Sequence, residues 1–134
     1  MRILSVDYAL FEHEASGPWS TDDCGWHQID GELRFELEGG ECVFLSWGSS
    51  PATYCIQMQP ASFFNNGVLA TRQMSEHPYW TPFINKECHL RYQSDDNQVL
   101  AFSTEARILY LSSQYDDGDF YGDCVRISPT PPDE

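Results

Sequence analysis

The sequence predicts a mainly β protein, either an antiparallel sandwich or a half-open barrel, with little helix. The clearest observation is the stretch 31–47, in which Leu33, Phe35 and Leu37 alternate with charged residues. This two-residue period is typical of a strand with one buried face. Gly39-Gly40 then tolerates the positive φ of a tight turn, and apolar residues alternate again on the return strand. We therefore expect a β-hairpin whose inward residues belong to the core.

Further strand patterns recur along the chain, and the helical period is absent from all but one short stretch. The other predicted strands cover residues 2–11, 53–59, 87–93, 98–103, 107–113 and 124–127. The irregular segment 19–29 is expected to be a loop whose tryptophans fold back onto the sheet, and the proline-containing segment 77–83 an extended crossover. The stretch nearest to an amphipathic helix is 68–76, which would give about two turns at most.

The chain length of 134 residues and its hydrophobic content of 41% suit a single domain with its own core. We assign residues 1–128 to this β domain. Residues 129–134 hold three prolines, which leave few backbone donors, so this segment is predicted to be a disordered Pro-rich tail.

The two halves of the chain resemble one another in register. When the second half is aligned with the first, Leu33-Arg34-Phe35 falls on Leu90-Arg91-Tyr92 without a gap. This predicts two related β-meanders, an internal duplication of about residues 31–59 and 88–113. The alternative is that any two amphipathic hairpins of similar length superpose in this way.

Charge is the most unusual property of the composition. The chain has 21 acidic and 7 basic residues, a formal net charge of −14, and Lys86 is its one lysine. Such a surface repels nucleic acid and anionic membranes, whose phosphates need basic side chains. The acids either keep an aromatic-rich domain soluble or steer a basic partner into contact.

Apolar runs and cysteines bear on the cellular compartment. No run of about eighteen apolar residues is available to cross a bilayer, and an acid follows the first few residues before a signal-peptide core could form. The chain has five cysteines, an odd number at irregular spacing, which is a poor disulfide framework. The sequence therefore predicts a cytoplasmic protein.

Motifs for metal binding and catalysis are weak. Cys24 with His27 is one pair of zinc-type ligands, Cys88 with His89 is too tightly spaced to be typical, and there is no Cys-x-x-Cys. The chain has no Gly-x-Ser-x-Gly motif, and no glycine-rich loop carries a lysine. We therefore predict no cofactor and no metal site, and we lean toward a non-enzymatic protein.

An acidic, aromatic segment near the end of the chain is the leading candidate site. Its charged residues are Asp116, Asp117, Asp119 and Asp123, and its aromatic residues are Tyr115, Phe120 and Tyr121. Binding hot spots combine aromatic burial with nearby charge, so this segment is predicted to contact a basic protein partner. In size and charge the chain resembles the small acidic immunity proteins that neutralise basic bacterial toxins, which implies an immunity- or inhibitor-like role.

Two alternative functions remain open. A ligand-binding or enzymatic barrel would have a pocket of aromatic and histidine residues, namely Trp26, Trp47, His77, Tyr79 and Trp80. A buried histidine beside a carboxylate would favour it, whereas a closed core and exposed acids would favour the binding protein. The second alternative is a structural subunit that forms a homodimer through an apolar face or an unpaired edge strand.

Overall fold

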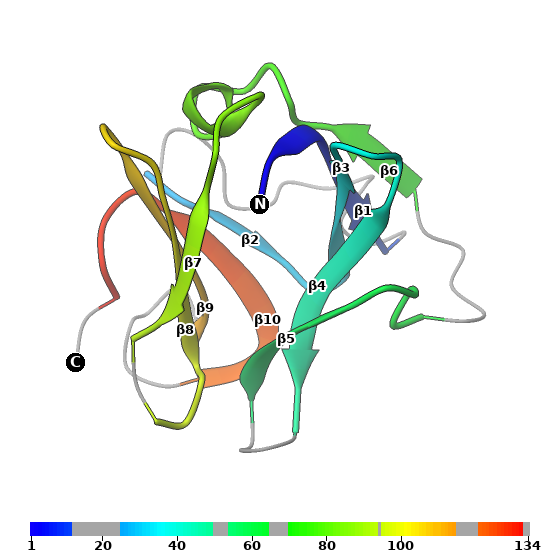
Figure 1. Cartoon of the computed structure of the whole chain (residues 1–134). Coiled ribbons are helices and arrows are strands. Elements are labelled where there is room, and N and C mark those ends of the chain that lie inside the picture. Colours follow the sequence, from blue (N-terminus) through cyan, green and yellow to red (C-terminus); the bar gives the residue numbers. More distant parts are fainter. Residues whose placement is uncertain (12–24, 50–53, 65–69, 94, 115–120, 133–134) are drawn as a thin grey trace.

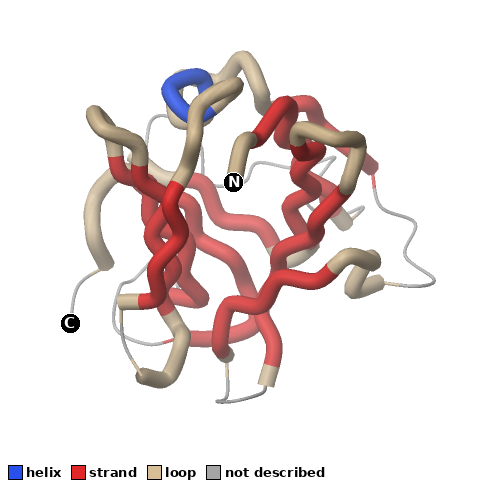
Figure 2. Tube along the Cα trace, in the orientation of Figure 1, coloured by secondary structure: helices blue, strands red, loops and turns tan. Residues whose placement is uncertain are grey.

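The computed structural model describes residues 1–11, 25–49, 54–64, 70–93, 95–114 and 121–132. Within these ranges the chain forms two five-stranded antiparallel sheets, which do not close into a barrel and are arranged as a sandwich (Figures 1 and 2). The predicted mainly β class is confirmed, in its sandwich form. None of the helices in the described ranges is long and apolar enough to span a membrane.

The first sheet is built from β1 and β3–β6, and the second from β7–β10 together with β2, which comes from the N-terminal part of the chain. The first sheet has the order β5 (Cys55–Gln59), β4 (Cys42–Gly48), β3 (Glu32–Leu37), β1 (Ile3–Leu10) and β6 (Ala70–Gln73). The second has the order β2 (His27–Ile29), β10 (Tyr121–Ser128), β9 (Ile108–Gln114), β8 (Val99–Ser103) and β7 (His89–Tyr92). A short 3-10 helix, η2 (Thr81–Phe83), precedes β7.

The hairpin predicted over 31–47 is β3–β4. Leu33 pairs with Leu45 across the two strands, so that both face the same side of the sheet. Gly39 and Gly40 have φ values of 101° and 89°, the left-handed region that glycine enters without steric cost. Leu33, Phe35 and Leu45 are fully buried, as expected for the inward face of this hairpin.

Two local predictions differ from the structure, and a third segment forms a strand that the sequence does not predict. The expected loop 19–29 ends in strand β2, because β10 supplies its backbone partners. Ala70–Gln73 is the edge strand β6 and not part of a short helix, since it pairs with β1. The expected extended crossover contains η2, whose Pro82 lies in the first turn, where a missing N–H costs no intrahelical bond.

The two predicted meanders lie in different sheets. β3, β4 and β5 are consecutive in the first sheet, and β7, β8 and β9 are consecutive in the second. β3 lies inside its sheet next to β1, whereas β7, which it matches in the sequence alignment, is an edge strand. The internal duplication stays a prediction, as does disorder of the tail, of which residues 129–132 are described.

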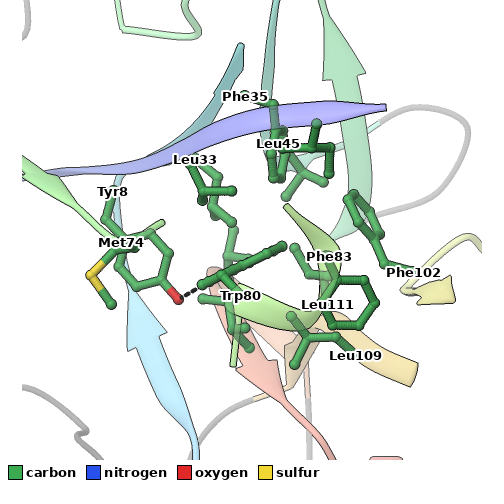
Figure 3. Close-up of a cluster of buried hydrophobic side chains, with 14 of the residues drawn as sticks. Tyr8, Leu33, Phe35, Leu45, Met74, Trp80, Phe83, Phe102, Leu109 and Leu111 are labelled. Atoms are coloured by element: carbon green, nitrogen blue, oxygen red, sulfur yellow. Dashed lines mark hydrogen bonds between the residues drawn. The ribbon is translucent and has the colours of Figure 1, made fainter. Parts of the chain in front are cut away.

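The sheets enclose a core built around an aromatic side chain from the crossover. Trp80 is fully buried, and its ring contacts Phe35 of the first sheet and Phe102 of the second at centroid distances of 5.6 and 6.1 Å (Figure 3). Phe83 packs beside Trp80 at 6.2 Å. Burying one large apolar side chain contributes about 1.5–3 kcal/mol, so this plug is a major stabilising element.

Hydrogen bonds also join the sheets near the start of β5. The Ile56 N–H donates to the carbonyl oxygen of Asn97 at 2.8 Å, and the Tyr92 hydroxyl donates to the Ile56 carbonyl oxygen at 2.6 Å. Burial raises the pKa of Tyr92 above the ordinary value of a phenol, which keeps this hydroxyl a donor. Tyr54 and Asn97 adopt positive φ values of 60° and 58° here, so the contact between the two sheets involves local backbone strain.

The N-terminus is held against the connection that leads into β7. The Met1 ammonium group lies 2.7 Å from the Glu87 carboxylate, and the Cys88 N–H donates to the Met1 carbonyl oxygen at 2.7 Å. The hydrogen bond from the ammonium group, and its charge, hold the pKa of Glu87 below its usual value. Burial raises the pKa of the Cys88 thiol, which therefore stays protonated.

A glycine substitution tests how closely β1 and the start of β3 approach. A Cβ atom on Gly31 would lie 1.9 Å from the Ala9 carbonyl oxygen, a backbone atom that cannot move alone. We expect Gly31→Ala to lower the free energy of unfolding by about 3 kcal/mol, the cost of a severe overpacking. Urea denaturation measures it. The control is Gly48→Ala, whose Cβ meets only the flexible end of Gln57, and equal losses in the two variants would contradict the prediction.

The Glu87 contact predicts a pH dependence. A lowered folded-state pKa means that Glu87 stabilises the fold above its unfolded pKa, and that this contribution is lost as the pH falls through the folded value. We expect the wild type to lose more stability between neutral and acidic pH than Glu87→Gln, which has no carboxylate to protonate. Denaturation at a series of pH values measures the difference, with Glu41→Gln as control. Parallel stability curves for the wild type and Glu87→Gln would refute it.

Candidate functional site

A chain of hydrogen bonds runs through the buried aromatic cluster. The Trp80 indole N–H donates to the Tyr8 hydroxyl oxygen at 2.9 Å, and the same hydroxyl lies 2.9 Å from His27 Nδ1 (Figure 3 shows the first of these contacts). Since the indole can only donate, the phenol oxygen accepts from Trp80 and keeps its own proton, which it can donate to an unprotonated His27 Nδ1.

His77 and Tyr79 extend this cluster from the crossover. The His27 ring lies 4.5 Å from the His77 ring and 4.7 Å from the Tyr79 ring, measured between centroids. The Tyr79 backbone N–H donates to His77 Nδ1 at 3.1 Å, which fixes the orientation of that ring. His27 is 1% exposed, whereas His77 and Tyr79 are half-buried.

The structure brings together three of the five residues predicted for an aromatic pocket. His77, Tyr79 and Trp80 share the cluster just described, and Trp80 is part of the core. Trp26 lies 4.7 Å from the Arg126 guanidinium group, a cation–π contact. Trp47 packs against Tyr54 at 6.0 Å.

Sequence reasoning missed Tyr8 and His27 as members of the cluster. Tyr8 was assigned to a strand, but its hydroxyl has no sequence signal because the alternation pattern only marks it as inward. His27 was considered as a zinc ligand with Cys24, which lies outside the described residues. The one sequence signal that could have pointed to Tyr8 is a tyrosine at an inward position of a strand, since a buried phenol hydroxyl needs a hydrogen-bond partner.

Two connections leave the second sheet at the same end. Val99, the first residue of β8, pairs with Ser112 of β9. Gln114, the last residue of β9, pairs with Tyr121, the first of β10. The β7–β8 connection therefore lies at the end of the sheet from which the β9–β10 connection departs, which is the lower end in Figure 1.

Carboxylates collect at this end. Asp95 and Asp96 lie in the β7–β8 connection and are exposed, as is Asp123 near the start of β10. Asp30 directly follows β2 and is half-buried, next to Ile29, which pairs with Val125 of β10. We call Asp30, Asp95, Asp96 and Asp123 the acidic end.

The predicted partner-binding segment is described only from Tyr121 onward. Tyr115, Asp116, Asp117, Asp119 and Phe120 lie outside the described residues, between the last residue of β9 and the first of β10. Tyr121 starts β10. The sequence does not associate Asp95 and Asp96 with Asp123, because their place at the same end of the sheet follows from the pairing register of β8, β9 and β10.

Neither metal-site geometry nor similarity to known proteins assigns a function to the acidic end. In the described ranges, no group of three or more His, Cys, Asp or Glu residues could hold a metal ion. Comparisons with protein-family models, with curated proteins and with solved structures found no significant match.

Removing the central hydroxyl of the aromatic cluster tests its structural role. Tyr8→Phe leaves the buried Trp80 indole N–H and His27 Nδ1 without the partner that joins them. We expect the free energy of unfolding to fall by about 1–3 kcal/mol, the cost of an unsatisfied buried polar group. Thermal or urea denaturation provides the measurement.

The matched control is Tyr110→Phe, which removes the hydroxyl of a half-buried tyrosine on β9. It should change stability by less than about 0.5 kcal/mol. A Tyr8→Phe variant as stable as this control would show that the hydrogen-bond chain contributes nothing to the fold.

Proposed function

We propose that this chain is a small acidic binding protein, not an enzyme, that engages a basic protein partner through its acidic end. The observation that carries the proposal is the register of the second sheet, because it gathers Asp30, Asp95, Asp96 and Asp123 at one end. The adjoining segment 115–120 adds three aspartates and two aromatic residues by sequence.

The charge distribution supports a directional contact. The opposite end of the sandwich carries Arg2, Lys86 and Arg107, together with the N-terminal ammonium group. A protein with negative charge at one end orients a basic partner before contact and raises its association rate. Aromatic anchors would then supply most of the binding energy, a role for which Tyr115, Phe120 and Tyr121 are the candidates.

The aromatic–histidine cluster supports a binding protein over an enzyme. His27 is 1% exposed, and its Nδ1 lies 2.9 Å from the hydroxyl of Tyr8. Trp80, on the other side of that phenol, is fully buried in the core. This arrangement joins the two sheets, and an acid–base site needs a group that reaches a substrate.

The proposal includes a cytoplasmic, immunity- or inhibitor-like role, in which the acidic end would cover the basic surface of a bacterial toxin. The thiols of Cys42 and Cys88 are free, which agrees with a reducing compartment. A homodimer through an exposed edge is the alternative, and β6, all of whose residues are exposed, is the strand that would form it.

Charge-neutral variants test the proposal with a lysine-rich peptide as the basic probe. Asp95→Asn/Asp96→Asn/Asp123→Asn removes three charges from the acidic end and retains the shape of the side chains. We expect affinity for the probe to fall by about tenfold, or ~1.4 kcal/mol, with a shallower dependence on salt. Fluorescence anisotropy over a salt series measures both. A second variant carries Asp116→Asn, Asp117→Asn, Asp119→Asn and Asp123→Asn.

The control removes the same number of charges elsewhere. Glu36→Gln/Glu41→Gln/Glu76→Gln changes three exposed glutamates, two in the β3–β4 hairpin and one after β6. It makes the net charge less negative by the same amount, so a purely non-local effect would weaken both triple variants alike. Equal loss in the two, or no loss at the acidic end, would reject the proposed site.

A further inference from the structure

A surface depression lies at the end of the sandwich opposite the acidic end. It has a volume of ≈ 690 Å³, within the range of about 300–1,000 Å³ that is typical of small-molecule sites. Its walls come from η2, from the connection into β7 and from the β8–β9 turn, which Figure 1 shows on the two sides of the upper end of β7. The lining residues are Pro82, Lys86, Glu87, His89, Thr104, Glu105, Ala106 and Arg107.

The depression concentrates positive charge in a strongly acidic protein. It contains the one lysine of the chain, Lys86, and also Arg107, although the net charge of the molecule is −14. Glu87 lies in its wall, but the N-terminal ammonium group at 2.7 Å already neutralises that carboxylate. Counting the N-terminal ammonium group that pairs with Glu87, three positive groups and two carboxylates lie in or beside the depression. The second carboxylate is that of Glu105.

The cations of the depression are available to a ligand. Among the residues that the structure describes, Lys86 and Arg107 make no ion pair, even though carboxylates line the same depression. The Thr104 hydroxyl oxygen accepts from the N–H groups of Ala106 and Arg107, each at 3.3 Å, which leaves its proton free to donate. Lysine, arginine and a hydroxyl donor together are suited to an anionic group.

We propose that this depression binds a small ligand through a carboxylate or phosphate group held between Lys86 and Arg107. Lys86 supplies a compact charge, and the Arg107 fork supplies two parallel donors to two oxygens of the anion. His89 and Thr104 add polar contacts from β7 and from the end of β8. Glu105, the carboxylate nearest to Arg107 in the sequence, opposes the bound negative charge.

This site is independent of the proposed function. It lies at the other end of the sandwich, and its residues include none of the aspartates assigned to the partner contact. A ligand here would therefore be bound alongside a protein partner and not in competition with it.

The test is an NMR titration of the full chain at physiological ionic strength, with inorganic phosphate and with acetate as separate probes. We expect saturable shifts of backbone amides at residues 86–89 and 104–107 with at least one probe. Shifts with both mean that the anionic group alone is recognised, and shifts with one assign the site to that class of anion. The absence of saturable shifts at these amides with both probes overturns the proposal.

Variants identify the groups responsible. Lys86→Gln and Arg107→Gln should each weaken binding by about tenfold, since each removes one charge-assisted contact. Glu105→Gln should strengthen it by a few-fold, because it removes a repulsive carboxylate. The control Arg91→Gln removes an exposed cation of β7 that does not line the depression. If Arg91→Gln weakens binding as much as Lys86→Gln, or if Glu105→Gln weakens it, the anion is not held as proposed.

Discussion

The fold depends on Trp80, because this single side chain joins three separate parts of the chain. Its ring contacts Phe35 of the first sheet and Phe102 of the second, and these two rings also contact each other at a centroid distance of 5.4 Å. Its indole N–H bonds Tyr8 of the first sheet, and Tyr8 in turn bonds His27 of the second. A crossover segment thus locks the sheets together through both packing and polar contacts, and such a satisfied buried network specifies one arrangement of the sheets.

The rigid centre determines what the two ends can do. Since the two sheets pack against each other, the ends of the paired strands are fixed relative to one another. One end gathers Asp30, Asp95, Asp96 and Asp123, and the other gathers Lys86, Arg107 and the N-terminal ammonium group. The net charge alone conceals this separation, because it averages over the whole surface. The net charge also counts Glu32, an acid that contributes little to the surface because it is 3% exposed. Its carboxylate accepts hydrogen bonds from the Ser62 hydroxyl and the Phe63 N–H.

The sequence predicts the strands well and their neighbours poorly. The alternation of Leu33, Phe35 and Leu37 marks β3 because burial of one face imposes a two-residue period. No comparable pattern marks β2 or β6, which are short strands formed by pairing with β10 and β1. Their formation depends on backbone partners distant in the sequence, a tertiary effect that overrides weak local preference.

Prediction of the candidate sites from the sequence is limited in the same way, because each site depends on residues that are distant in the sequence. The segment 115–123 stands out in the sequence because its acids and aromatic residues are contiguous, whereas Asp95 joins it only through the register of β8 and β9. The depression is harder still to predict, since Lys86 and Arg107 come from turns separated by two strands, β7 and β8. Residue types that are unremarkable singly become a site when the fold brings them together. In a chain with 7 basic and 21 acidic residues, the location of the rare cations is therefore more informative about the binding of an anionic ligand than the location of the abundant acids.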